Sequence, residues 1–217
     1  MASKYSTLRN LLSEADFPAI VKFAGKHKRA LSFLTALTYD TDHLISWRAV
    51  EALGLAASRI AKDDQEYIRI HLRRLVWLLN DESGGIGWRA PEALGEIIYN
   101  CPDLFAEFIP ILVNLMDMEP EDAVRFRAGW LWAIGRLALV QPDDVQSALP
   151  WIIPCLDDPN PQARGMAVWC LSEMSHSLPS NRVDALQSDQ GQVELYFSPN
   201  TVAIRIGDLA KKLANQT

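Results

Sequence analysis

The sequence predicts an all-α fold of stacked antiparallel helix pairs, closed by a small C-terminal β-hairpin. Three observations predict it: a recurring ten-residue block, a helical spacing of apolar residues within each block, and alternating residues near the C-terminus. The chain has 217 residues and a formal net charge of −6. We expect one solenoid domain, because no helix pair could bury its apolar side alone.

The block repeats four times with little variation in spacing. Two copies are nearly identical, and successive copies start 41, 40 and 37 residues apart: Ile45–Gly54, Ile86–Gly95, Phe126–Gly135 and Ala163–Ser172. At 100° per residue, block positions 1, 5, 8, 9 and 12 fall on one arc of a helix. All twenty residues at these positions are apolar. Each block therefore predicts a helix with one arc in the core.

Other apolar segments alternate with these blocks and predict the first helix of each pair. Each fits one helix of about 11–14 residues bounded by turn residues: Tyr67–Leu79, Leu104–Met116 and Val145–Leu156. Pro110, Pro150 and Pro154 lie inside two of them. Since proline lacks the backbone donor of a helix interior, we expect kinks there.

The two ends of the chain differ from the repeats. Residues 1–40 predict N-terminal capping helices, residues 41–178 about four repeats, and residues 179–217 a C-terminal cap. Within that cap, Val193–Phe197 and Thr201–Ile206 alternate and predict a hairpin over 193–206, followed by a helical turn or two. We expect the hairpin to pack on the last helices through Val193, Leu195 and Phe197; an edge strand that binds a partner is the alternative.

The repeat resembles the HEAT-repeat family, especially short bacterial proteins described as lyase-like HEAT repeats. The match is best at Leu156–Arg164 followed by Ala167 and Leu171, against the family's Asp-Pro, arginine, alanine and leucine-glycine positions. The resemblance spans roughly residues 28–178 and implies a right-handed α-α superhelix of the HEAT/armadillo type. Arg127 holds the family's arginine position, whereas Ser46 and Gly87 replace it, so we expect no unbroken Asp–Arg ladder.

The sequence contains none of the catalytic or cofactor-binding motifs considered below. The four histidines are scattered, no zinc spacing or phosphate-binding motif occurs, and we expect no metal, cofactor or catalytic residue. The odd cysteine count fits a reducing cytoplasm, and no apolar run is long enough for a membrane span. From Leu75 onward the sequence has 9 basic and 19 acidic residues, and this excess of negative charge weighs against nucleic-acid binding.

The arc opposite the core carries a second pattern, at block positions 3, 4, 7, 11 and 14. In the HEAT-repeat family, which the sequence resembles, this side of the second helix of each pair lines a concave groove. Tryptophan and arginine, the residues most enriched at binding hot spots, recur on it beside glutamates. We call these the groove residues: Trp47, Arg48, Glu51, Trp88, Arg89, Glu92, Glu96, Tyr99, Trp132, Arg136, Trp169, Glu173 and His176.

The sequence therefore favours a cytoplasmic, non-catalytic scaffold that binds a protein or peptide through the groove residues. Two alternatives come from the resemblance. HEAT-like alkylpurine DNA glycosylases use concave tryptophans beside an acid, which invites comparison with Trp132, Trp169 and Glu173, and a bilin-lyase-like enzyme follows from the family label alone. A third interpretation is structural: the tryptophans cover gaps between adjacent helices as peripheral core.

Overall fold

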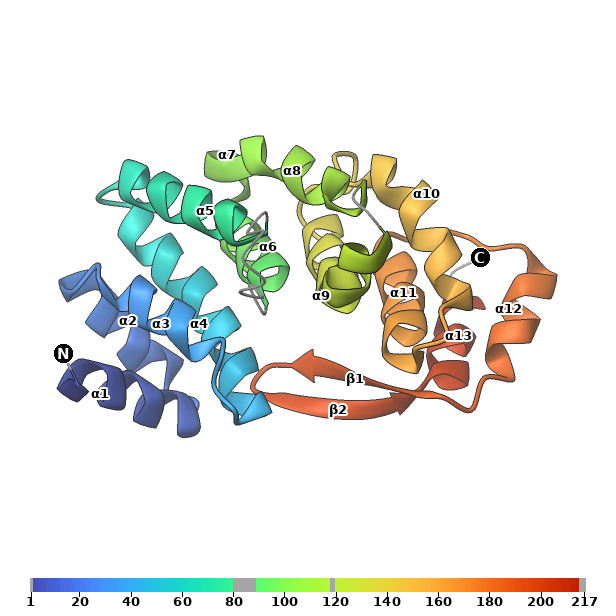
Figure 1. The fold of residues 1–217 in the computed structure, drawn as a ribbon, viewed down its shortest axis with the longest axis horizontal. Helices are drawn as coiled ribbons and strands as arrows, with labels where there is room; N and C mark the ends of the chain where they lie inside the picture. Colours follow the sequence, from blue (N-terminus) through green and yellow to red (C-terminus); the bar gives the residue numbers. More distant parts are fainter. Residues whose placement is uncertain (1, 80–88, 118–119, 215–217) are drawn as a thin grey trace. The chain divides into compact units, whose positions relative to one another are not determined.

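The computed structural model describes residues 2–79, 89–117 and 120–214, and it is mostly helical. The chain divides into two compact units (Figure 1). The N-terminal unit comprises residues 1–108 together with Ser198–Asn200, and the C-terminal unit comprises residues 109–197 and 201–217.

The N-terminal unit consists of helices, and the first three lie within residues 1–40. Their bounds are α1 (Ala2–Ser13), α2 (Phe17–Lys26), α3 (Ala30–Leu37), α4 (His43–Ala61), α5 (Gln65–Leu79), α6 (Ala90–Asn100), α7 (Pro102–Phe105) and the 3-10 turn η1 (Ala106–Phe108). The first capping helices pack on α4, and α4 packs along α6, which places two successive blocks side by side.

The C-terminal unit adds two further repeats and the hairpin. Its elements are α8 (Ile109–Val113), η2 (Asn114–Met116), α9 (Pro120–Ala138), η3 (Gln146–Ala148), α10 (Leu149–Ile152), η4 (Ile153–Asp157), α11 (Pro161–Glu173), α12 (Ser180–Gln187), β1 (Gln192–Phe197), β2 (Asn200–Arg205) and α13 (Ile206–Ala214). Helices α9 and α11, the third and fourth blocks, pack against each other. Each unit thus contains two block helices in contact, which confirms the predicted stacking of successive repeats within each unit.

Side-chain caps precede two of the block helices, α4 and α11. Asp42 precedes α4, and its Oδ1 accepts hydrogen bonds from the backbone N–H groups of Leu44 and Ile45 at 3.0 and 3.2 Å. Asn160 precedes α11, and its Oδ1 accepts from the N–H of Gln162 at 2.9 Å. Each cap satisfies backbone donors that the first helical turn leaves without a partner.

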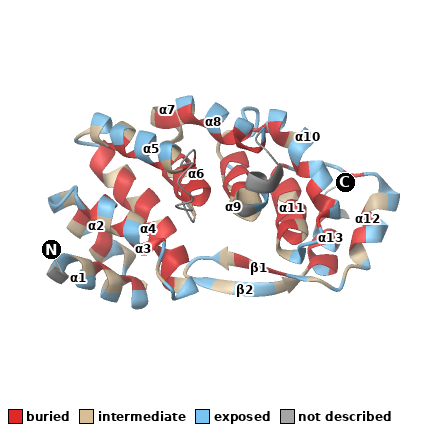
Figure 2. Ribbon diagram, viewed as in Figure 1, coloured by how far each residue is buried: buried red, intermediate tan, exposed pale blue. Residues whose placement is uncertain are grey.

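The apolar arc is the core of both units, as the period of the sequence predicts. Of its described residues, every one is buried except Phe126, which is half-buried; Ile86 lies outside the described residues (Figure 2). Trp130 is the largest fully buried side chain, and its indole N–H donates to the carbonyl of Leu112 at 2.7 Å.

Two predicted helices are broken more severely than expected. Leu104–Met116 is divided among α7, η1, α8 and η2, and Val145–Leu156 among η3, α10 and η4. Pro110, Pro150 and Pro154 each remove a backbone donor. The backbone hydrogen bonds of these segments therefore alternate between the α and 3-10 patterns, and neither segment is one helix with a single kink.

The hairpin packs on α11 and forms a two-stranded sheet of β1 and β2. Val193 and Leu195 are buried, but Phe197 is exposed, so the expectation that all three share the packed face is wrong for Phe197. The side-chain amide of Gln162 donates to the Glu194 carbonyl at 2.8 Å and accepts from the Glu194 N–H at 2.9 Å. Gln162 thus occupies the strand edge at Glu194 as a neighbouring strand would.

Candidate binding surface

Arg89 is the centre of the groove residues in the N-terminal unit. Its guanidinium lies over the Trp47 indole, with Cζ 3.9 Å from the ring centroid. Its Nε donates to Ser46 Oγ at 2.6 Å, and Nη1 pairs with Glu92 at 3.2 Å. Arg89 also has a left-handed backbone, with φ of 60°, directly before α6. Such a conformation costs energy for a residue with a side chain, so several contacts hold it in place.

Two carboxylates of α6 are buried behind this cluster. Burial raises the pKa of Glu92, and the neighbouring Arg89 opposes that rise. Glu96 is buried and accepts a hydrogen bond from Asn100 Nδ2 at 3.1 Å. Tyr99 is half-buried on the same helix. The predicted residues of α6 are therefore close together, but the two glutamates are covered rather than open to solvent.

Arg48 and Glu51 lie one turn apart on α4 and bind main-chain and hydroxyl groups. The buried Arg48 donates to the carbonyls of Leu12, Ser13 and Pro199 at 2.9, 2.8 and 2.9 Å. Glu51 accepts a hydrogen bond from Ser198 Oγ at 2.8 Å. Spacing in the sequence could not reveal these partners.

The C-terminal unit brings together four more groove residues on α9 and α11. The Arg136 guanidinium lies 5.6 Å from the Trp132 ring centroid. Burial raises the pKa of Glu173, while Arg136 and a hydrogen bond with Trp169 lower it. Gly135 makes room for Trp169, since a Cβ there would lie 2.5 Å from Trp169 Cζ3. Arg136 and Glu173 are half-buried, as is His176 beyond the end of α11.

The tryptophans that the structure describes among the groove residues are buried. Trp47, Trp132 and Trp169 are only 4%, 3% and 8% exposed, and Trp88 lies outside the described residues. Arg89 covers Trp47, and the contact with Gly135 draws Trp169 onto the neighbouring helix. The more exposed groove residues are polar or aromatic, and we call them the rim of their own unit: Glu51, Arg89 and Tyr99 in the N-terminal unit, and Arg136, Glu173 and His176 in the C-terminal unit.

Among the tryptophans that the structure describes, the two most exposed are not groove residues. Trp77 on α5 is 65% exposed, and Trp151 on α10 is also exposed. Both come from the first helix of a pair, where the sequence predicts only apolar packing. The helical period places a residue on one face but does not say whether another element covers that face.

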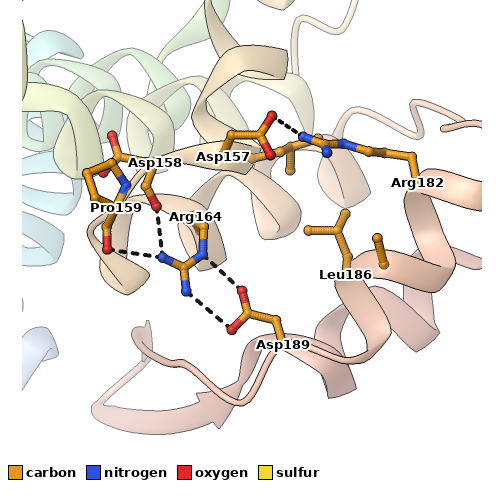
Figure 3. A pocket seen from close by; sticks show the side chains of 9 residues that line it. Asp157, Asp158, Pro159, Arg164, Arg182, Leu186 and Asp189 are labelled. Carbon is orange, nitrogen blue, oxygen red and sulfur yellow. Dashed lines mark hydrogen bonds and ion pairs between the residues drawn. The ribbon is translucent and has the colours of Figure 1, made fainter.

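A pocket of about 350 Å³ lies in the C-terminal unit, where η4 meets α11 and α12 (Figure 3). Arg164 crosses it and holds Asp189 with two hydrogen bonds of 2.9 and 3.2 Å, while Nη1 donates to the carbonyls of Asp158 and Pro159. These bonds hold the pKa of Asp189 below its ordinary value. Arg182 pairs with Asp157 at the pocket wall.

The arginines of this region form the Asp–Arg steps that the resemblance implies. Arg127 pairs with Asp158 of the next repeat, and Arg164 pairs with Asp189 of the segment after α12. The position equivalent to Arg127 on α4 is Ser46, which accepts from Arg89 instead. The sequence points to Arg127 and Arg164 but not to Asp189, which lies outside the repeated blocks.

The described residues offer little for metal or thiol chemistry. No group of three His, Cys, Asp or Glu side chains among them could hold a metal ion. All three cysteines are buried, and burial raises the pKa of Cys155 to about 11 and that of Cys170 further. Within the described ranges, no helix is both long and apolar enough to cross a membrane.

Comparisons with known proteins agree with a repeat architecture. Residues 124–174 match the family model of the HEAT-like repeat. An uncharacterised protein of Archaeoglobus fulgidus is 26% identical over 184 residues, covering 84% of this chain and 94% of its own.

Two solved structures are similar over nearly the whole of both chains. A designed armadillo repeat protein in complex with the peptide (KR)4 has a TM-score of 0.49 and 20% identity, covering 97% of this chain and 98% of its own. An archaeal HEAT-like repeats protein from Thermococcus onnurineus has a TM-score of 0.38 and 19% identity, and the similarity covers 98% of this chain and 96% of that protein. The matched residues run from α9 to the end of α11, so the similarity to a HEAT-like repeat covers the third and fourth blocks.

Proposed function

We propose that the chain is a non-catalytic scaffold that binds another protein through the rim. The observation that carries the proposal is the arginine held over a buried indole in each unit, Arg89 over Trp47 and Arg136 over Trp132. A guanidinium already fixed on a ring loses little side-chain freedom when a partner binds. Arg89 lies beside the buried Glu92 and Arg136 beside the half-buried Glu173, and arginine and tryptophan are the residues most enriched at binding hot spots.

The burial of the indoles weighs against the glycosylase-like alternative. An enzyme that extrudes a base stacks it between exposed aromatic rings. Trp132 and Trp169 are covered, and Glu173 is engaged with Trp169 and Arg136. The excess of acidic residues from Leu75 onward also disfavours contact with a phosphate backbone.

A pair of arginine variants tests the proposal. A partner is identified by affinity capture from native lysate, purified, and titrated calorimetrically with the parent chain, with Arg136→Ala and with Arg73→Ala. Arg73 is an exposed arginine on α5 that pairs with Glu66, so its removal is a control for the loss of one positive charge. We expect Arg136→Ala to weaken binding at least about tenfold, or ~1.4 kcal/mol, and Arg73→Ala to leave it unchanged.

Equal affinities for all three proteins would contradict the proposal. Circular dichroism melts of both variants show whether they remain folded, so that a loss of binding is assigned to the rim rather than to unfolding.

A further inference from the structure

In the N-terminal unit, two groove residues already hold a short peptide segment. Ser198–Asn200, the tripeptide at the tip of the hairpin, is part of this unit. Arg48 Nε donates to the Pro199 carbonyl at 2.9 Å, and Glu51 Oε1 accepts from the Ser198 hydroxyl at 2.8 Å. One α4 side chain thus recognises a main-chain carbonyl and the other a hydroxyl, the groups that a Ser-Pro or Thr-Pro turn presents.

The site is rigid and its occupant is exposed. Arg48 is buried, and its Nη1 is fixed by the carbonyls of Leu12 and Ser13 at the end of α1. Its Nε therefore points in one direction whether or not Pro199 is present. By contrast, Ser198 and Asn200 are exposed and Pro199 is half-buried. A pre-formed donor bound to an exposed segment is suited to exchange of that segment.

We propose that Arg48 and Glu51 form a binding site for an unphosphorylated Ser/Thr-Pro turn of a partner protein, which Ser198–Asn200 occupies until the partner displaces it. This inference rests on the proposed function and names its ligand in the N-terminal unit. Glu51 sets the requirement for a free hydroxyl, because a phosphate group on that oxygen would remove the donor and bring negative charge against the carboxylate.

The tether makes the tripeptide a strong competitor for its size. A segment joined to the same chain acts at an effective concentration of the order of millimolar, so a free peptide must exceed that to enter. Replacing Ser198 and Pro199 by glycine removes the hydroxyl that Glu51 binds and makes the turn more flexible, although the carbonyl at position 199 remains. The affinity for a free peptide should therefore rise, although no contact to that peptide is added.

The test uses the full chain and a labelled synthetic peptide with the sequence of residues 195–202, Leu-Tyr-Phe-Ser-Pro-Asn-Thr-Val. Binding is followed by fluorescence anisotropy for the parent and for the double variant Ser198→Gly/Pro199→Gly. We expect the double variant to bind the peptide at least about tenfold more tightly than the parent. A probe phosphorylated on its serine should bind the double variant at least about tenfold more weakly than the plain probe.

Two further substitutions, both made in the double variant, examine the site itself. Glu51→Ala should remove the gain in affinity, whereas Arg59→Ala, which removes a partly exposed arginine of the same helix, should not. Glu51 is used because Arg48 also joins α4 to α1, and its loss could unfold the unit.

Equal peptide affinity for the parent and the double variant would overturn the inference, as would a gain that survives Glu51→Ala. Concentration-dependent dimerisation of the parent, lost in the double variant, would also overturn it by making the tripeptide of a second copy the occupant. If any of these results appears while a partner still binds in an Arg136-dependent way, only this inference fails and the proposed function stands.

Discussion

Replacing Gly54 by alanine should destabilise the N-terminal unit, although alanine is the better helix former. A Cβ at Gly54 would lie 2.7 Å from the Glu96 carbonyl oxygen and 2.4 Å from Asn100 Nδ2 on α6. The carbonyl belongs to the backbone, so the clash is relieved only if α4 and α6 move apart. If the helices stay in place, the new Cβ instead displaces the Asn100 side chain, whose Nδ2 donates to the Glu96 carbonyl at 2.9 Å.

The magnitude follows from two opposing effects. Alanine gains about 0.5–1 kcal/mol over glycine in a helix interior. Overpacking against a backbone atom costs about 1–3 kcal/mol or more. We therefore expect Gly54→Ala to lower the free energy of unfolding by about 1–2 kcal/mol, measured by urea titration as a shift of midpoint at unchanged slope.

Gly25→Ala is the matched control in the same unit. Its nearest neighbour would be the side chain of Arg59, with Nε at 3.1 Å, and this partly exposed side chain can move aside. We expect Gly25→Ala to be neutral or stabilising by up to about 1 kcal/mol. The reasoning is refuted if Gly54→Ala is as stable as the parent, or if Gly25→Ala is the more damaging change.

Three other predictions concern stability and order. Trp130→Ala should cost about 3–5 kcal/mol, because it leaves a cavity and removes the donor to Leu112, whereas the exposed Trp77→Ala should stay within about 0.5 kcal/mol; urea unfolding of both variants decides. Burial lowers the pKa of His71 to about 4, with Arg74 adding to the effect, from an ordinary value of 6.5. The unfolded chain therefore binds a proton at His71 more readily than the folded chain does. The contribution of the neutral His71 to the free energy of unfolding is complete above pH 6.5, and up to about 3 kcal/mol of it is lost as the pH falls towards 4. His71→Gln should remove this slope, whereas the exposed His27→Gln should not. Finally, amide exchange at Val193 and Leu195 should be slow in the parent and fast in Gly165→Ala, since a Cβ at Gly165 would lie 2.4 Å from Val193 Cβ. Fast exchange in the parent would contradict the packing of the hairpin on α11.

The helical period accounts for what the sequence predicts well. Ala49, Ala90 and Trp130 share one block position, and all three are buried in the structure. The alternation at Val193 and Leu195 likewise predicts the strand and its buried face. Both patterns depend on neighbouring residues alone, which is why they can be seen in one sequence.

The features that the sequence does not predict depend on contacts between distant segments of the chain. Gly54 and Gly135 hold the same block position, and each meets the next repeat closely, but nothing in the spacing says so. Trp47 belongs to the predicted arc, yet Arg89 from the following repeat covers it. Arg48 and Pro199 are 151 residues apart, so only the folded chain brings them together.

Site-specific photo-crosslinking tests the central claim, that a partner protein contacts the rim. A photoreactive phenylalanine analogue replaces Tyr99 in the N-terminal unit or His176 in the C-terminal unit, both half-buried rim positions. Trp77 and Trp151 serve as exposed aromatic controls, one in each unit. After irradiation in cells, adducts are identified by mass spectrometry. The account predicts partner adducts at Tyr99 or His176 and none at the controls; adducts at Trp77 or Trp151 alone would contradict it by placing the binding surface on the first helices of the pairs.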